Sequence, residues 1–108
     1  MSLKNQNRIA FGYNRSILGK IEINKLQAQT VQLIFQLYAD GKSMGKITEQ
    51  FEACGIPSPY NKSKWGKQTL SKILSYERYL GDENYPQIIE KEQFDHVQTI
   101  KKSWAKWE

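Results

Sequence analysis

Hydrophobic residues recur every three or four positions in several stretches of the chain, and this spacing predicts amphipathic helices. In the first stretch, Asn24 is placed to cap the start of a helix and Gly41 to end it. Its apolar positions are Leu26, Val31, Ile34, Phe35 and Tyr38. Glutamines occupy much of the remaining surface, so we interpret residues 24–40 as a core helix with a polar outer face.

Three further helices are predicted. The second follows Ser43 as its N-cap and ends at Gly55. Its apolar positions are Met44, Ile47 and Phe51. The third covers residues 67–76, with Gly66 at the N-cap position and with Leu70, Ile73 and Leu74 facing inward. The last begins near Lys91, and its apolar positions are Phe94, Val97, Ile100 and Trp104.

The segments between the helices follow other patterns. Residues 11–23 predict a short hairpin with Gly19 near its turn, and residues 85–89 predict an extended segment. Residues 56–64 cannot extend the second helix, because Pro57 and Pro59 interrupt it. The fold class we expect is mainly α: a small helical bundle that contains a helix-turn-helix, with a short N-terminal β-hairpin.

The length of 108 residues fits one small domain. Along the chain we expect a flexible arm over 1–10, the hairpin over 11–23, a helical core with the helix-turn-helix over 24–81, and a C-terminal extension and helix over 82–108. No apolar run has the ~20 residues that a membrane span needs, and no signal peptide opens the chain. We therefore expect no membrane partner and a cytoplasmic location.

The single cysteine and the single histidine limit the chemistry. Cys54 has no internal disulfide partner, and together with His96 it cannot supply the four ligands of a structural zinc site. His96 is predicted to be a surface residue. No phosphate-binding glycine loop, carboxylate pair or activated nucleophile is present. We expect no cofactor, no metal and no catalytic residue in this chain.

Basic residues are segregated along the chain, which carries a net charge of +5. Four precede the first acidic residue: Lys4, Arg8, Arg15 and Lys20. Four more lie between residues 53 and 76, again without an acid: Lys62, Lys64, Lys67 and Lys72. This segregation favours a side that faces a polyanion, such as a nucleic acid. The alternative is a basic surface that only aids solubility.

The third helix is the best candidate for base recognition. A helix that buries its leucines and isoleucine leaves a polar set outside: Lys67, Gln68, Ser71, Lys72 and Ser75. Glutamine can pair with adenine through two hydrogen bonds, lysine can reach guanine or phosphate, and serine can contact either. We predict that Lys67, Gln68, Ser71 and Lys72 enter the major groove of double-stranded DNA.

The connection between the second and third helices is longer than the three or four residues of a usual helix-turn-helix. It is either a disordered bridge or a basic loop along the DNA backbone, in which Tyr60, Lys62 and Lys64 contact phosphate or sugar. Arg15 and Arg8 are predicted to hold phosphates or an adjacent groove. A solvated loop is the alternative for each loop residue.

Trp65 directly precedes the third helix, where a base-stacking role and a core role are both conceivable. A tryptophan beside an aliphatic helix is more often part of the core, and we predict the same for the tyrosines. These are Tyr13, Tyr38, Tyr76 and Tyr79.

Taken in order, a series of residues resembles the recombinase domain of large serine site-specific recombinases, the integrases and transposases of phages and mobile elements. The series runs through Phe11-Gly12-Tyr13, Ala28, Val31, Ile34-Phe35, Tyr38, Gly41, Ser43, Ile47, Gly55-Ile56-Pro57, Pro59, Trp65, Leu70, Ile73-Leu74, Arg78-Tyr79 and Gly81. It continues with Tyr85-Pro86, Ile88-Ile89, Glu92, Phe94 and Val97-Gln98. No single piece is diagnostic, but the order and spacing cover nearly the whole chain.

The resemblance implies site-specific recombination, in which a serine hydroxyl attacks a phosphodiester and strands exchange within a tetramer. In that family the serine belongs to a separate N-terminal domain, and a zinc-binding domain follows further on. The resemblance thus implies a fragment without chemistry of its own that binds an attachment site in double-stranded DNA. It also implies a bacterial, nucleoid-associated location and a dimeric or tetrameric full-length protein.

The chain departs from the family pattern at Ala10, Gln27 and Gly66, where proline, acids and a serine or threonine are common. These changes affect helix caps and local stability. Two other functions remain open: a helix-turn-helix transcription regulator, and a helical module that binds an acidic protein partner.

Overall fold

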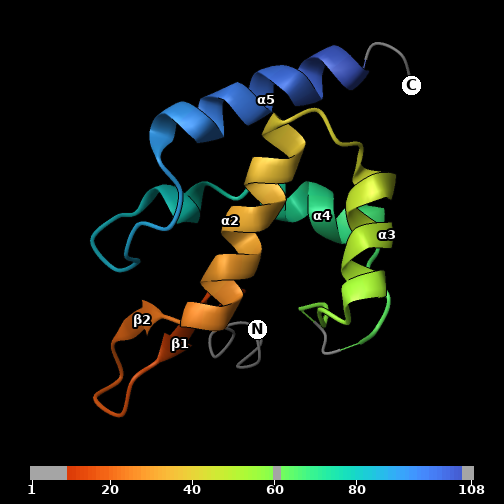
Figure 1. Cartoon of the computed structure of the whole chain (residues 1–108). Coiled ribbons are helices and arrows are strands. Elements are labelled where there is room, and N and C mark those ends of the chain that lie inside the picture. The colour runs from red at the N-terminus through yellow and green to blue at the C-terminus, as the bar shows by residue number, and fades with distance from the viewer. Residues whose placement is uncertain (1–9, 60–61, 106–108) are drawn as a thin grey trace, which may run out of the picture.

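The computed structural model describes residues 10–59 and 62–105. In these ranges the elements are β1 (Tyr13–Arg15), β2 (Ile21–Ile23), α2 (Lys25–Ala39), α3 (Met44–Cys54), α4 (Lys67–Leu74), the 3-10 helix η1 (Glu77–Leu80) and α5 (Lys91–Ala105) (Figure 1). The prediction of a mainly helical domain with a short N-terminal hairpin is confirmed.

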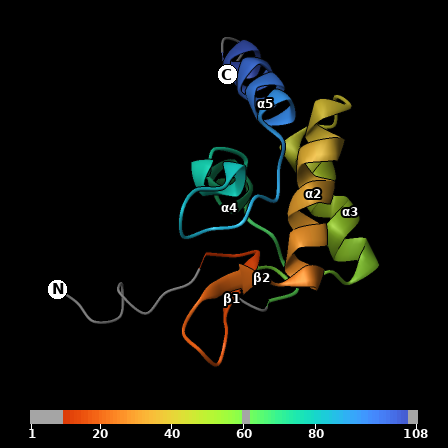
Figure 2. The same cartoon turned by 90° about the vertical axis from the view of Figure 1, so that its left-hand side faces the viewer.

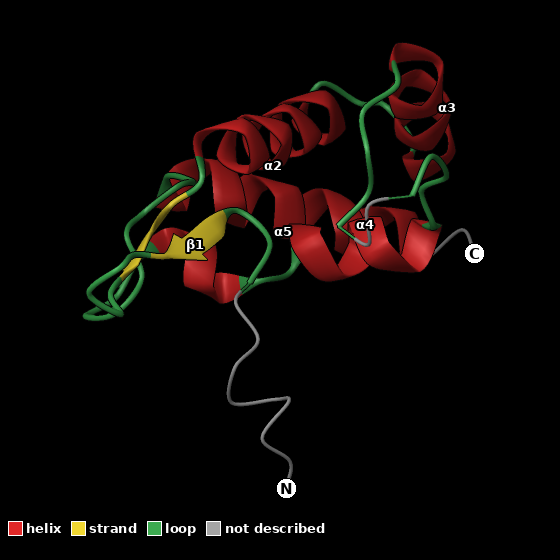
Figure 3. Cartoon of the chain, turned by 90° about the horizontal axis from the view of Figure 1, so that it is seen from below, coloured by secondary structure: helices red, strands yellow, loops and turns green. Residues whose placement is uncertain are grey.

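The hairpin is a two-stranded antiparallel sheet in which Tyr13 lies opposite Ile23 and Arg15 opposite Ile21. Its turn is closed by a hydrogen bond from the Gly19 N–H to the Ser16 carbonyl at 2.9 Å. Gly19 has a φ of +86°, a backbone conformation that residues with a Cβ rarely adopt. The hairpin lies at one end of the molecule and α3 at the other (Figure 3).

Local capping explains where α2 and α3 begin. The Asn24 side chain accepts a hydrogen bond from the Gln27 N–H at 3.0 Å, and the Ser43 hydroxyl accepts one from the Lys46 N–H at 3.2 Å. At the other end of α3, Gly55 is left-handed with a φ of +74°. The predicted caps of both helices are therefore confirmed.

Leu26 was predicted among the apolar positions of the first helix, and this prediction is wrong: its side chain is 78% exposed. At ~100° per residue, Leu26 lies about 140° from Val31 around the helix axis, so it faces away from the core. Ala28, one turn before Val31, is buried in its place.

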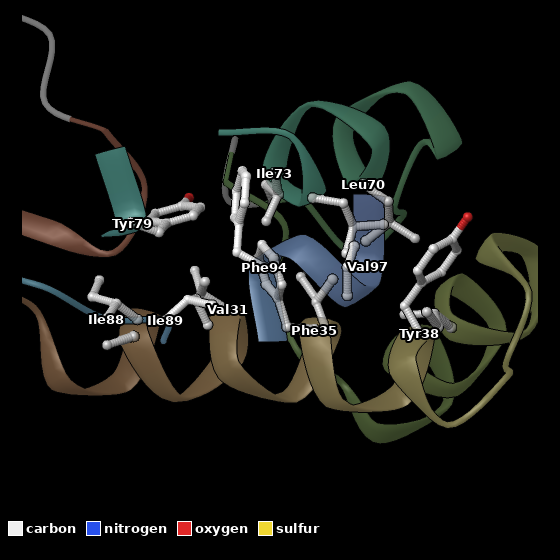
Figure 4. Packing of buried hydrophobic residues seen from close by; sticks show 14 of the residues in the cluster. Val31, Phe35, Tyr38, Leu70, Ile73, Tyr79, Ile88, Ile89, Phe94 and Val97 are labelled. Carbon is white, nitrogen blue, oxygen red and sulfur yellow. The ribbon is translucent and has the colours of Figure 1, made fainter. Parts of the chain in front are cut away.

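One hydrophobic core joins α2, α4 and α5 (Figure 4). The ring of Phe35 in α2 stacks on that of Phe94 in α5, with centroids 6.0 Å apart. Leu70 and Val97 are fully buried between the same helices. The domain boundaries remain a prediction, but the last helix belongs to the same core as the residues before 82.

Tyr79 ties η1 to two distant segments. Its backbone carbonyl accepts hydrogen bonds from the N–H groups of Ile88 and Ile89, both at 2.9 Å. Its hydroxyl donates to the Phe11 carbonyl at 2.8 Å, and burial raises the pKa of the phenol. The extended segment before α5 and the start of the hairpin are thus held by one residue.

Trp65 belongs to the core, as predicted. It is 5% exposed, and its indole N–H donates to the Ile56 carbonyl at 2.8 Å. Its ring meets that of Phe51 edge to face, with centroids 5.1 Å apart. Among the tyrosines predicted to be in the core, Tyr76 is half-buried and the others are buried: Tyr13, Tyr38 and Tyr79.

The start of α4 has no side-chain cap, because its N-cap is Gly66. Its backbone angles, φ −91° and ψ 145°, suit any L residue, and an added Cβ would make an ordinary 3.7 Å contact with the Thr69 hydroxyl. We expect Gly66→Ser to stabilise the chain by about 0.5–1 kcal/mol, because the hydroxyl caps the helix and the unfolded chain loses freedom.

Thermal unfolding checks this expectation, with an increase in Tm of several degrees at about 4–8 °C per kcal/mol. Gly66→Ala is the matched control, because it restricts the unfolded chain without supplying a cap. A serine variant no more stable than the alanine variant would show that α4 gains nothing from a capping hydroxyl.

Candidate nucleic-acid interface

The outer surface of α4 is polar, largely exposed and free of acidic residues. At ~100° per residue, Leu70 and Leu74 lie on the inner side of the helix, and both are fully buried. Gln68 and Lys72 lie on the opposite side, about 40° apart around the helix axis. Both are exposed. Figure 2 shows α4 nearly end-on, beside α2.

Lys67 and Ser71 lie toward one flank of this face. Lys67 is exposed, and its side chain lies close to Gly45 at the start of α3. A Cβ added at Gly45 would be 3.7 Å from Lys67 Cε. Lys67 and Lys72 are about 140° apart around the helix axis, with Gln68 between them. The structure therefore brings Gln68 and Lys72 together, while the two lysines lie on opposite flanks.

Ser71 is less accessible than its place on the outer face suggests. It is half-buried, and its hydroxyl accepts a hydrogen bond from Lys101 Nζ of α5 at 3.1 Å. The same ammonium donates to the Ser71 carbonyl at 3.2 Å and to the Ser75 hydroxyl. Among the predicted recognition residues, Ser71 thus has contacts within the protein itself.

The last four carbonyl oxygens of a helix have no hydrogen-bond partner within the helix. In α4, all four accept hydrogen bonds from other groups. The middle two accept backbone N–H groups of the residues that follow the helix. The Ser71 carbonyl accepts from Lys101, and the Leu74 carbonyl accepts from Gln98 Nε2 at 2.6 Å. Two side chains of α5 therefore cap α4.

This role of Gln98 and Lys101 was not predicted from the sequence. Gln98 follows Phe94 by four residues, and Lys101 follows Val97 by four and Phe94 by seven, which places both on the inner side of α5. Their position on the otherwise apolar side of α5 is the feature of the sequence that indicates a contact with another part of the protein. Burial lowers the pKa of the Lys101 ammonium, because desolvation disfavours its charged form.

The connection between α3 and α4 closes on itself. The Ser58 N–H donates to the Lys62 carbonyl at 2.9 Å, and the Lys62 N–H donates to the Ser58 hydroxyl at 3.2 Å. Ser58 is buried, whereas Lys62 and Lys64 are exposed. Tyr60 lies outside the described residues. These two hydrogen bonds join the described parts of the loop, and its contact with a DNA backbone stays a prediction.

The remaining predicted residues lie at or before the hairpin. Arg15 is exposed, and its Nη1 donates to the Gly19 carbonyl at 3.1 Å, so the guanidinium supports its own turn. Arg8 lies outside the described residues.

The lysines near α4 are not neutralised by acids. In the described ranges the ion pair joins Lys91 to Asp95 at 2.8 Å, both exposed on α5. Lys62, Lys64 and Lys72 form no ion pair with a described acid. This side of the molecule therefore keeps its positive charge, which favours an anionic partner.

A shallow depression elsewhere has the opposite character. It lies between α2 and the start of α5 and is lined by Gln32, Gln36, Ile88, Glu90, Glu92 and Gln93. Two carboxylates make it unsuited to a polyanion. The described residues hold no group of three or more histidine, cysteine or acidic side chains that could bind a metal. No described helix combines the length and apolarity of a membrane span.

Comparison with known proteins identifies one family, and two of the similar solved structures are described below. The sequence profile of the Recombinase family matches residues 25–103. A structure described as "Crystal Structure of a LSR-DNA Complex" aligns with a TM-score of 0.71 and 22% identity, covering 89% of this chain and 32% of that one. LSR denotes a large serine recombinase. No curated protein gives a significant match.

A second structure, described as "Sequence Requirements of the Listeria innocua prophage attP site", aligns with a TM-score of 0.70 and 22% identity. It covers 89% of this chain and 43% of that one. The chain therefore spans less than half the length of either protein. At this identity the two alignments establish a shared fold.

Proposed function

The chain belongs to the Recombinase family, and from that premise we propose that it binds double-stranded DNA as part of a site-specific serine recombinase. In this proposal the chain holds the attachment site, while a serine in another domain of the full protein attacks the phosphodiester. The full protein would act as a dimer or tetramer on DNA, in the cytoplasm of a bacterial cell at the nucleoid.

The observation that carries this proposal is the exposed outer face of α4. Gln68 and Lys72 stand together on a helix whose opposite side is fully packed. An α-helix fits the major groove of B-DNA, which is about 12 Å wide. Because residues 53–76 contain no acid, nothing on this helix repels the phosphates that border the groove.

Each residue of the face has a role in this proposal. Gln68 suits adenine, whose N6 and N7 match the donor and acceptor of a carboxamide. Lys72 suits guanine or a phosphate, and Lys67 on the α3 flank suits a phosphate at the groove edge. Ser71, held by Lys101, contributes at the other end of the face.

Lys62 and Lys64 precede α4 on the loop after α3 and are proposed to bind backbone phosphates, with Arg15 and Arg8 as further contacts. Phosphate contacts fix the position of a protein on DNA, and base contacts provide specificity. If about five phosphates are neutralised, the logarithm of the affinity falls with the logarithm of salt concentration at a slope near −4 to −5.

The structural relatives support this assignment. One is described as a complex of a large serine recombinase with DNA, and the other concerns a prophage attP site. A transcription regulator with the same helices would also bind DNA, but its parent gene would lack a catalytic serine domain. A module for acidic proteins would show no preference among DNA sequences.

We expect Gln68→Ala and Lys72→Ala each to weaken binding to a preferred duplex by about 1–3 kcal/mol and to reduce sequence preference. Preferred duplexes are first selected from a randomised pool with the unchanged 108-residue chain. Fluorescence anisotropy then compares the affinity for the selected duplex with that for a scrambled one.

Lys25→Ala and Gln29→Ala are matched controls, since these exposed residues have the same types and spacing on α2. Both control variants should bind like the unchanged chain. Equal losses from the α2 and α4 variants would remove α4 from the recognition surface.

For the loop, Lys62→Ala and Lys64→Ala should weaken binding to every duplex alike, because phosphates carry no sequence information. Each should also make the salt slope shallower by about 1, the contribution of one phosphate contact. Affinity measured from low to moderate salt gives both quantities. An unchanged slope would show that the loop lies outside the interface.

A further inference from the structure

The contact between Lys101 and the end of α4 has an unusual composition. All three oxygens around the ammonium are neutral: the carbonyl and hydroxyl of Ser71, at 3.2 and 3.1 Å, and the hydroxyl of Ser75. No carboxylate among the described residues forms an ion pair with it, and burial alone lowers the pKa of this lysine. A partly buried cation without an anion is a position that an anionic ligand would stabilise.

The two serines are left as hydrogen-bond donors. A hydroxyl has one proton and two lone pairs, and Lys101 uses a lone pair of each. Within the described residues, neither hydroxyl donates its proton to another group. Threonines of the other helices behave differently: Thr30, Thr48 and Thr99 each donate to a backbone carbonyl. The protons of Ser71 and Ser75 therefore remain available to an acceptor outside the protein.

The placement of the two hydroxyls suits a single ligand. Ser71 and Ser75 are four residues apart, so they lie about 40° apart around the helix axis and one turn apart along it. Ser75 is exposed and Ser71 half-exposed, and Lys72 lies on the same outer surface. Two hydroxyl donors above a lysine ammonium match the several acceptor oxygens of a phosphate group.

We propose that Ser71, Ser75 and Lys101 form a binding site for one phosphodiester of the DNA backbone, at the end of α4 where α5 crosses it. The proposal rests on the proposed DNA binding and adds a contact from the last helix. The serines donate to the phosphate oxygens, while Lys101 orients both hydroxyls and supplies the charge.

Lys101 also removes an obstacle to binding at this end. The C-terminal end of a helix carries a partial negative charge from its free carbonyls, which disfavours a nearby phosphate. By donating to the Ser71 carbonyl, Lys101 places a positive charge where that negative end would face the DNA. Lys62 and Lys64 before α4 and Lys101 after it would then hold the backbone on both sides of the groove.

The first test replaces Lys101 with methionine, which keeps most of the aliphatic chain and removes the charge. We expect Lys101→Met to bind every duplex about tenfold more weakly and to make the salt slope shallower by about 1. Lys102→Met is the matched control, because the neighbouring lysine is exposed and loses the same charge. Equal effects of the two variants would overturn the proposal.

A second variant keeps the test valid if Lys101→Met fails to fold. Ser75→Ala removes an exposed donor and leaves Lys101 in place, and we expect binding about threefold to tenfold weaker. Ser103→Ala is the control, because it changes an exposed serine of α5 outside the site, and its affinity for DNA should be unchanged. A Ser75→Ala variant that binds like Ser103→Ala would remove the hydroxyls from the site.

The most specific measurement replaces single phosphates of the selected duplex with uncharged methylphosphonates. With the unchanged chain, a methylphosphonate at the phosphate that contacts this site should weaken binding. The same replacement should cause no further loss in Lys101→Met or in Ser75→Ala. The same losses at every position in all three proteins would contradict the proposal. Inorganic phosphate is the second arm: competition stronger than that of chloride at equal ionic strength would assign the site to free phosphate instead.

These outcomes separate the two proposals. If Lys72→Ala weakens binding while Lys101→Met and Lys102→Met behave alike, DNA binding stands and this site is wrong. If neither the α4 nor the α5 variants differ from their controls, both the α4 face and this site are wrong, and the DNA-binding function itself fails if the unchanged chain selects no duplex.

Discussion

The burial of one side of α4 is the constraint on which the rest of the structure depends. A helix of eight residues does not persist alone in water, because so few hydrogen bonds cannot offset the ordering of its backbone. Leu70, Ile73 and Leu74 are therefore buried in the core that α4 shares with α2, α3 and α5, and α5 caps the end of the helix. Because stability comes from the inner side and from the capped C-terminal end, most of the outer side can remain polar and exposed.

Buried aromatic residues fix the chain on both sides of α4. Trp65 precedes it and is held by hydrogen bonds to Glu52 and Ile56, and Tyr79 follows it and is held to Phe11 and Ile88. The helix cannot turn about its axis without disrupting one of these contacts. A recognition helix held in this way meets its ligand in a fixed orientation, and little ordering then has to accompany binding.

Much of this fold is encoded locally and was predictable from the sequence. Helical periodicity and the caps at Asn24, Ser43 and Gly55 located α2 and α3, and the family resemblance agrees with the Recombinase profile over residues 25–103. What local patterns did not predict depends on distant contacts. Examples are η1, whose Tyr79 binds residues 88 and 89, and the cover that Lys101 provides for Ser71. The exposed Leu26 shows that an apolar residue at the end of a periodic stretch need not reach the core.

In the proposed complex, the outer face of α4 lies in the major groove of DNA. The most direct measurement is an NMR search for intermolecular NOEs between the side-chain amide of Gln68 and the protons of a bound duplex. We expect NOEs to major-groove protons, such as cytosine H5, purine H8 or thymine methyl groups. A saturated complex in which Gln68 has no such NOEs, while side chains on the outward face of α2 do, would contradict this placement of α4.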